Sequence, residues 1–177
     1  MRRALDFAYD AAGYLEAFFV LAVFVVMVGG TVMRELGMRT GGQDDIVAWF
    51  CAASAFLAMA HTFRYGDFVR VTLFLEMFGP RLARAAEIWS LAIATAFVGF
   101  LAFWATRFVY ESWSFGDMAN GLIVIPIWIP QSSFVVGAVL LFVAVLDELV
   151  RTLRGERPAY VVAAEERRAR GDFSEEL

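Results

Sequence analysis

The side chains of this 177-residue chain that could do chemistry are few, and they form no known catalytic pattern. There is one cysteine, Cys51, and one histidine, His61, which excludes an internal disulfide, a thiolate metal site and a haem held by two histidines of one chain. Cys51 is expected as a small core residue and His61 as an interfacial residue at the end of a span. No Ser-His-Asp set, HExxH motif, Walker-type loop or GxGxxG motif occurs. We therefore expect a protein that is not an enzyme and that holds no cofactor or metal.

Glu16 is the carboxylate of greatest chemical interest, because it lies within a long apolar stretch. An ionisable residue inside a membrane span is a candidate for proton coupling, as in small exporters with four helices. The alternative is a carboxylate near the start of a helix, stabilised by the helix dipole and able to reach lipid headgroups. Glu16 is only about one turn into the expected span, so the second interpretation is favoured.

The amino-acid composition places these side chains in a membrane protein. Hydrophobic residues make up 60% of the chain, charged residues only 19%, and 18 residues are phenylalanine. When glycine is counted and tyrosine is left out, the apolar share is roughly 65%, against about 45–50% in soluble domains. The net charge of −4 argues against a nucleic-acid partner. A soluble globular fold is therefore excluded, and membrane lipids are the expected surroundings.

Four long runs without a charged residue define the elements that must position these side chains. A helix needs about 20 largely apolar residues to cross the hydrocarbon core. A charge near the bilayer centre costs roughly 2.5–3.5 kcal/mol on insertion scales, so charge-free runs of this length indicate spans. The sequence predicts an all-α membrane protein with four transmembrane helices near 12–33, 46–63, 87–107 and 130–149.

The distribution of arginine predicts the orientation of these spans. Of the 15 arginines, 12 lie in the N-terminal segment, the middle loop and the C-terminal tail, and 3 lie in the other two loops. By the positive-inside rule, both termini and the middle loop are cytoplasmic. The membrane domain is expected over residues 1–155, followed by a charged cytoplasmic tail over 156–177. Within the middle loop, the apolar stretch 68–78 is expected to lie along the membrane interface.

Small residues in the third span recur at spacings of three and four, which places them on one stripe of a helix. Such a stripe lets a second helix approach closely. The spacing alone favours ordinary packing inside a four-helix bundle, and docking against another membrane subunit is the alternative. The stripe comprises Ala92, Thr95, Gly99, Ala102 and Thr106.

Three further motifs occur in a characteristic order. The middle loop contains Arg-Tyr-Gly-Asp-Phe-Val-Arg-Val at 64–71, and Asp44 and Asp45 precede the second span. Ile-Pro-Ile-Trp-Ile-Pro-Gln at 125–131 comes just before the last span, which contains Gly137. In this order and placement, the motifs resemble the small membrane subunit of TRAP transporters, the DctQ family.

The resemblance covers roughly residues 5–155 and departs from the family pattern at two positions. Members of the family often carry a histidine where this chain has Phe68, and an aspartate where it has Thr72. The two departures put a polar role of these positions in doubt, though not the resemblance itself.

The resemblance implies a function that composition cannot show. TRAP systems are secondary transporters that import organic acids, often C4-dicarboxylates, with an ion gradient that is usually sodium. An extracytoplasmic solute-binding protein captures the solute, and a large membrane subunit carries the substrate and sodium sites. The resemblance thus implies a scaffold in the bacterial inner membrane, bound to the large subunit. The alternatives are a self-sufficient proton-coupled exporter that uses Glu16 and an assembly subunit of another membrane complex.

The resemblance also makes subunit contact the favoured interpretation of the small-residue stripe. The two arginines of the middle-loop motif are assigned to the inner interface, where they hold headgroups or the loop fold, with plain topology signalling as the alternative. Trp128 is expected to anchor the outer interface, and Gln131 either bonds a neighbouring chain or is a polar residue at a helix start. The candidates for subunit or lipid interfaces are Arg64, Arg70, Trp89, Ala92, Thr95, Gly99, Ala102, Trp128 and Gln131.

Overall fold

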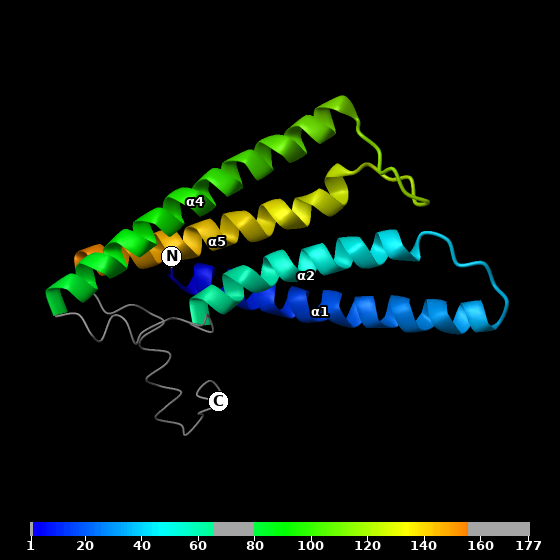
Figure 1. The fold of residues 1–177 in the computed structure, drawn as a ribbon, viewed down its shortest axis with the longest axis horizontal. Coiled ribbons are helices and arrows are strands. Elements are labelled where there is room, and N and C mark those ends of the chain that lie inside the picture. Colours follow the sequence, from blue (N-terminus) through cyan, green and yellow to red (C-terminus); the bar gives the residue numbers. More distant parts are fainter. Residues whose placement is uncertain (1, 66–79, 156–177) are drawn as a thin grey trace, which may run out of the picture.

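The computed structural model describes residues 2–65 and 80–155, and these residues form four long helices (Figure 1). All four are long and apolar enough to cross a membrane, which confirms the predicted all-α class with four helices. Each predicted span lies inside one helix, and each helix is longer than its span. The predicted interfacial stretch 68–78 falls outside the described residues. The helices are α1 (Arg2–Glu35), α2 (Gln43–Tyr65), α4 (Pro80–Phe115) and α5 (Trp128–Arg154).

Local sequence explains where several of the helices begin and end. α4 begins at Pro80, whose fixed φ and missing N–H suit the first position of a helix. α2 carries Asp44 and Asp45 in its first turn, where the helix dipole stabilises negative charge. α5 is followed by Gly155, which has a φ of 81° and donates its backbone N–H to carbonyls of the last turn. This left-handed conformation favours glycine, because a Cβ would be strained there.

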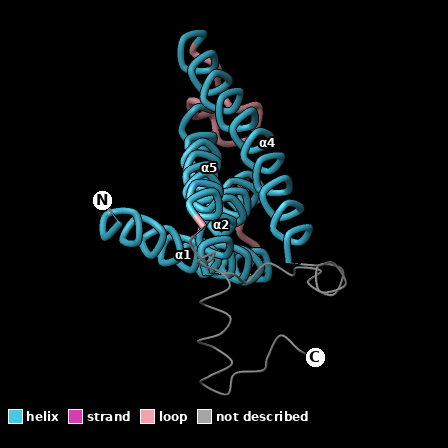
Figure 2. The backbone as a smooth tube through the Cα atoms, turned by 90° about the vertical axis from the view of Figure 1, so that its left-hand side faces the viewer, coloured by secondary structure: helices cyan, strands magenta, loops and turns pink. Residues whose placement is uncertain are grey.

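The helices lie side by side in a row, and they do not close into a four-helix bundle. The main contacts join α1 to α2, α2 to α5 and α5 to α4, so α1 and α4 form the two edges (Figures 1 and 2). The N-terminus and the end of α5 lie at one end of the row, which we call the terminal end. The connections 36–42 and 116–127 lie at the other end, which we call the loop end. This arrangement leaves both broad faces of the row uncovered by the described helices.

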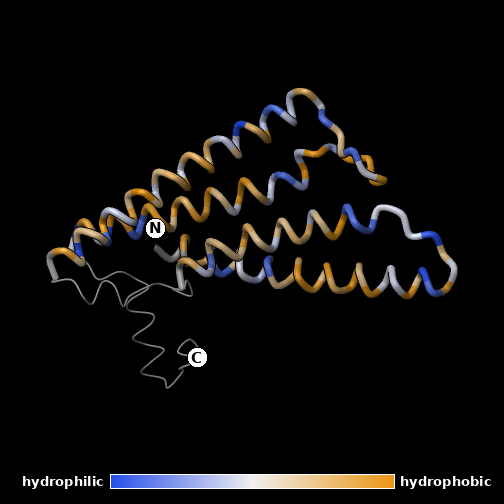
Figure 3. The backbone as a smooth tube through the Cα atoms, viewed as in Figure 1, coloured by the Kyte–Doolittle hydropathy of each residue, from blue (hydrophilic) through white to orange (hydrophobic). Residues whose placement is uncertain are grey.

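Small residues make up most of the buried positions between neighbouring helices, and many large apolar side chains are exposed. The buried large apolar side chains among the described residues are Tyr9, Leu57, Leu91 and Val145. Figure 3 shows hydrophobic residues along the length of the helices, with hydrophilic residues gathered toward their ends and connections. Small residues inside and large apolar ones outside are typical of helices that pack in lipid. The most buried small residues are Ala12, Ala53, Ala60, Ala102, Ala105, Ala138 and Ala144.

The contact between α2 and α5 depends on a glycine. A Cβ at Gly137 would overlap the backbone carbonyl group of Phe56 on α2. Because backbone atoms of a helix cannot turn aside as a flexible side chain can, glycine is required for this approach. The rings of Phe56 and Phe134 pack beside it with centroids 4.3 Å apart. Gly137 therefore sets the distance between the two central helices of the row.

Gly137→Ala is expected to destabilise the row, because the added methyl group meets backbone atoms. Overpacking of this kind costs about 1–3 kcal/mol. The matched control is Gly29→Ala on α1, where a Cβ would have no atom within 4 Å. Denaturant unfolding in detergent should show a lower midpoint for Gly137→Ala and an unchanged or slightly higher one for Gly29→Ala. Equal midpoints for the two variants would contradict the role assigned to Gly137.

Candidate functional site

The single cysteine and the single histidine both lie on α2, in different surroundings. Cys51 is exposed, which corrects its expected place in the core. His61 is half-buried, and its Nδ1 lies 3.1 Å from the backbone oxygen of Tyr9 on α1. The imidazole thus joins α2 to α1 toward the terminal end. In the two described ranges, no three His, Cys, Asp or Glu side chains gather closely enough to hold a metal ion.

The small-residue stripe of α4 faces α5 over part of its length. A Cβ at Gly99 would lie 2.8 Å from a ring carbon of Phe142, and Ala102 is only 6% exposed. Thr95 donates its hydroxyl to the carbonyl of Leu91 in its own helix, at 2.7 Å. Gly99 and Ala102 are therefore engaged in packing within the chain, which is the interpretation that the spacing alone favours. Partner contact through the other residues of the stripe stays a prediction.

The opposite face of α4 is aromatic and exposed. Trp89, a predicted interface residue, is 70% exposed. Large side chains follow it at spacings of four, four, three, four and four, which keeps them on one side of the helix. The spacing of these large side chains is visible in the sequence, but the sequence-based prediction for this helix is based on its small residues. We call it the aromatic face of α4, and it comprises Trp89, Ile93, Phe97, Phe100, Trp104 and Phe108.

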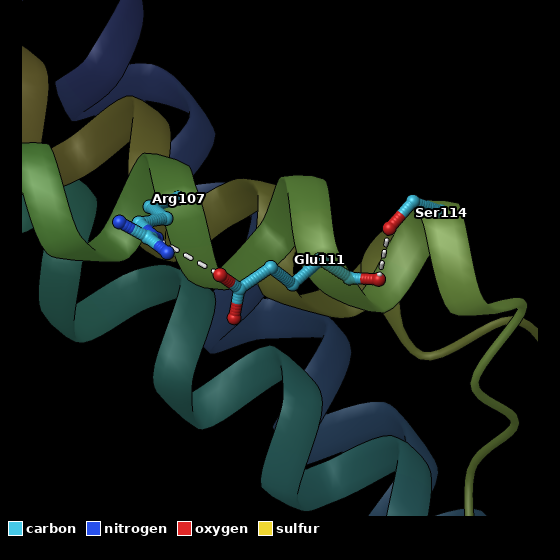
Figure 4. A network of polar contacts seen from close by, with 3 residues as sticks. All are labelled: Arg107, Glu111 and Ser114. Carbon is cyan, nitrogen blue, oxygen red and sulfur yellow. Dashed lines mark hydrogen bonds and ion pairs between the residues drawn. The ribbon is translucent and has the colours of Figure 1, made fainter.

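A charged pair lies near the loop end of α4. Arg107 Nε donates to Glu111 Oε1 at 2.8 Å, and the two side chains are 56% and 46% exposed. The guanidinium carbon of Arg107 lies 5.3 Å from the ring centroid of Trp104. The backbone oxygen of Glu111 accepts a hydrogen bond from the Ser114 hydroxyl at 2.9 Å (Figure 4). An exposed ion pair contributes only about 0–1 kcal/mol to stability, so this pair is not what holds α4 in place.

Asp45 ties the connection between α4 and α5 to the start of α2. Its Oδ2 accepts hydrogen bonds from the backbone N–H of Leu122, at 2.9 Å, and of Ile123, at 3.4 Å. The connection itself folds back through an antiparallel bridge between Met118 and Pro126. The sequence indicates an acidic start for this helix, but not the segment that the carboxylate would hold. Asp45 thereby links the two halves of the chain at the loop end.

Gln43 ties the start of α2 to α1. Its Nε2 donates to the backbone oxygen of Val26 at 2.6 Å. The amide lies over Gly30 of α1, where a Cβ would overlap it. Sequence reasoning missed both residues, because only the pairing of α1 with α2 brings them together. With His61 toward the terminal end and Gln43 at the loop end, polar contacts fix α1 to α2 at both ends of their interface.

Two predicted interface residues lie at the start of α5. Trp128 lines a groove between α5 and α4. Gln131 is half-buried, and its Oε1 is buried without a hydrogen-bond donor among the described residues. The expected bond from Gln131 to a neighbouring chain stays a prediction.

Three further candidates lie toward the terminal end or beyond the described ranges. Glu16 is half-buried on α1 and makes no hydrogen bond or ion pair with another described residue. Arg64 lies in the last turn of α2, and Arg70 falls outside the described residues. The assignment of the two arginines to the inner interface stays a prediction.

The fold first defines a class of protein, a multi-pass membrane protein with four apolar helices in a row. The chain belongs to the DctQ family, since residues 2–155 match the family described as "Tripartite ATP-independent periplasmic transporters, DctQ component". The match confirms the resemblance seen in the sequence, covers all four helices and places the chain among transporter components, which are not a family of enzymes. No curated protein matches the chain significantly.

Asp45→Ala is expected to release the connection between α4 and α5, because it removes the acceptor of two backbone N–H groups. A hydrogen bond to a charged group is worth about 1.5–3 kcal/mol, so the amides of Leu122 and Ile123 should exchange with deuterium roughly tenfold faster or more. Asp44→Ala is the control, because Asp44 is exposed in the same turn and makes no described bond to the connection. Equal exchange in the two variants would show that the Asp45 carboxylate does not hold this segment.

Proposed function

We propose that this chain is the small scaffold subunit of a TRAP-type secondary transporter. In this proposal, the transporter imports an organic acid such as a C4-dicarboxylate, driven by a sodium gradient. The large membrane subunit carries the solute and the ions, and an extracytoplasmic solute-binding protein delivers the solute. The family match over residues 2–155 is the observation that supports this function most directly.

The use of polar side chains supports the scaffold role. Gln43 and His61 hold α1 against α2, and Asp45 holds the connection between α4 and α5. A path for ions or a charged solute needs polar groups that face a water-filled cavity. The polar groups of these contacts are directed at backbone atoms of neighbouring segments, which makes the row a rigid support.

The position of the chain ends supports the proposed orientation. The N-terminus and the end of α5 lie together at the terminal end, as an even number of spans requires (Figure 1). In the proposal, the terminal end is cytoplasmic and the loop end faces outward, since 12 of the 15 arginines lie in the two termini and the middle loop. The membrane is then the bacterial inner membrane, and the uncovered faces of the row are the surfaces that meet lipids and the large subunit.

Affinity purification of the full chain from its native membrane in mild detergent tests the proposal. We expect a stable complex with a much larger protein of many spans, because the row has wide apolar faces that the described helices do not cover. Proteoliposomes of the complex with the solute-binding protein should take up an organic acid when a sodium gradient is applied. Recovery of a homodimer that moves solute unaided would contradict the scaffold role.

Glu16 is the observation that favours a second function, that of a proton-coupled exporter. Glu16→Gln removes the titrating group and keeps the size of the side chain. Under the scaffold proposal, uptake by the reconstituted complex should be within about twofold of the unmodified level, since a half-exposed glutamine adds no uncompensated charge. A loss of transport in a variant that still assembles with its partner would instead assign the coupling carboxylate to this chain.

A further inference from the structure

Arginine side chains gather at the terminal end, where the end of α5 lies beside the first turns of α4 (Figure 1). Arg84 of α4 has its Nη2 atom 3.3 Å from the position that a Cβ on Gly155 would take. Gly155 directly follows Arg154 and comes four residues after Arg151, both in the last turn of α5. Residues three and four apart lie on one side of a helix, so the guanidinium of Arg84 meets the part of α5 that carries the other two arginines.

Two of these arginines have no acidic partner. Arg84 and Arg154 are exposed, and neither makes a hydrogen bond or an ion pair with another described residue. A guanidinium carries five N–H donors, so two sets of donors are available at this place. Two positive charges brought together also repel each other, and they do so more strongly near hydrocarbon than in bulk water, because the dielectric constant is lower there. The arrangement therefore favours an anion between the two side chains.

The described carboxylates of the same turns do not supply this anion. Asp147 forms an ion pair with Arg151, with 3.0 Å between Oδ2 and Nε, and the Arg151 side chain is only 12% exposed. Glu87 and Glu148 make interactions of their own, and none of these involves the two exposed arginines. The complementary anion is therefore none of these three groups.

Stabilisation of the end of α5 is the alternative role for Arg84, because a helix C-terminus attracts positive charge. That end already has what it needs. Arg151 and Arg154 lie in its last turn, and the backbone N–H of Gly155 is bonded to carbonyl groups of the same turn. A third arginine, brought in from another helix, exceeds the requirement of capping.

The depth of the arginines specifies which anion is within reach. Arg84 is four residues, about 6 Å, before the uncharged run 88–106 that crosses the hydrocarbon. Headgroups occupy about 5–8 Å on each side of the hydrocarbon core. Arg84 thus lies at headgroup depth, where the abundant anion is the phosphate of a phospholipid. Basic pockets between membrane helices bind such headgroups on the cytoplasmic side, which is the side of the terminal end in the proposed orientation.

We propose that Arg84 and Arg154 bind the headgroup phosphate of one anionic phospholipid, such as phosphatidylglycerol. Arginine binds phosphate through two parallel N–H bonds, so the two side chains can hold its oxygens from both helices. A zwitterionic lipid fits less well, because its ammonium group would lie beside two positive charges. The bound lipid joins α4, an edge of the row, to α5. The site requires only that the chain lies in a membrane, so it is independent of the scaffold role and of the solute.

Native mass spectrometry of the full chain, delipidated in mild detergent with any bound partner, tests the site. The double variant Arg84→Gln, Arg154→Gln removes both charges, and Arg34→Gln, Arg39→Gln is the matched control. The control arginines are also exposed and make no described ion pair, and they lie toward the loop end. We expect the affinity for phosphatidylglycerol to fall about tenfold or more in the site variant and to stay within about twofold in the control. Phosphatidylcholine should bind equally to both variants.

A thermal unfolding measurement separates loss of the site from loss of the fold. Without added lipid, both variants should unfold at the midpoint of the unmodified chain, since all four substituted side chains are exposed. Excess phosphatidylglycerol should raise the midpoint of the unmodified chain and of the control, but not that of the site variant. Equal affinity for phosphatidylglycerol in the two variants would overturn the proposal. Displacement of the lipid by an equal concentration of inorganic phosphate would also overturn it, because the ligand would then be a free anion.

Discussion

The arrangement of the whole chain depends on the close approach of α2 and α5, the two central helices of the row. In hydrocarbon, backbone groups are already bonded within each helix, and lipid chains are as apolar as leucine, so helices gain little by hiding apolar surface from their surroundings. Contact at short distance holds them together, and the missing side chain of Gly137 permits that contact with Phe56. α1 is attached mainly to α2, and α4 to α5. Without the central contact, the described helices would form two hairpins joined mainly by the bonds of Asp45 at the loop end.

Polar contacts then determine how the helices align along their length. Such bonds contribute modestly in membranes, at about 0.6–2 kcal/mol each, but they are directional. His61 meets α1 at Tyr9, and Gln43 meets it at Val26, so the two contacts are separated by nearly equal lengths of both helices. A shift of α1 by one turn, about 5.4 Å, would break both contacts at once. The alignment is thus specified more strictly than apolar packing alone would specify it.

The sequence predicts which residues form the spans, but it does not predict which spans pack against each other. The reasons are physical. A charge in hydrocarbon is costly in any fold, so charge-free runs mark the helices whatever their arrangement. The order of the row depends instead on complementary faces: the spacing around Gly99 suits any partner helix, and the ring of Phe142 on α5 meets it in the structure. Asp45 is recognisable as the acidic start of a span, whereas the two N–H groups that it binds come from the far half of the chain. His61 resembles an interfacial residue until its contact with Tyr9 is known.

The length of α4 has a consequence for its position in the bilayer. Pro80–Phe115 has 36 residues, which corresponds to about 54 Å at 1.5 Å per residue. Its uncharged run 88–106 is about 29 Å long, close to the roughly 30 Å of the hydrocarbon core. Glu87 and Arg107 flank this run, so both ends of α4 extend past the hydrocarbon. A movement of α4 along its axis would bring one of these two charges into the hydrocarbon, so they fix the depth of the helix in the membrane.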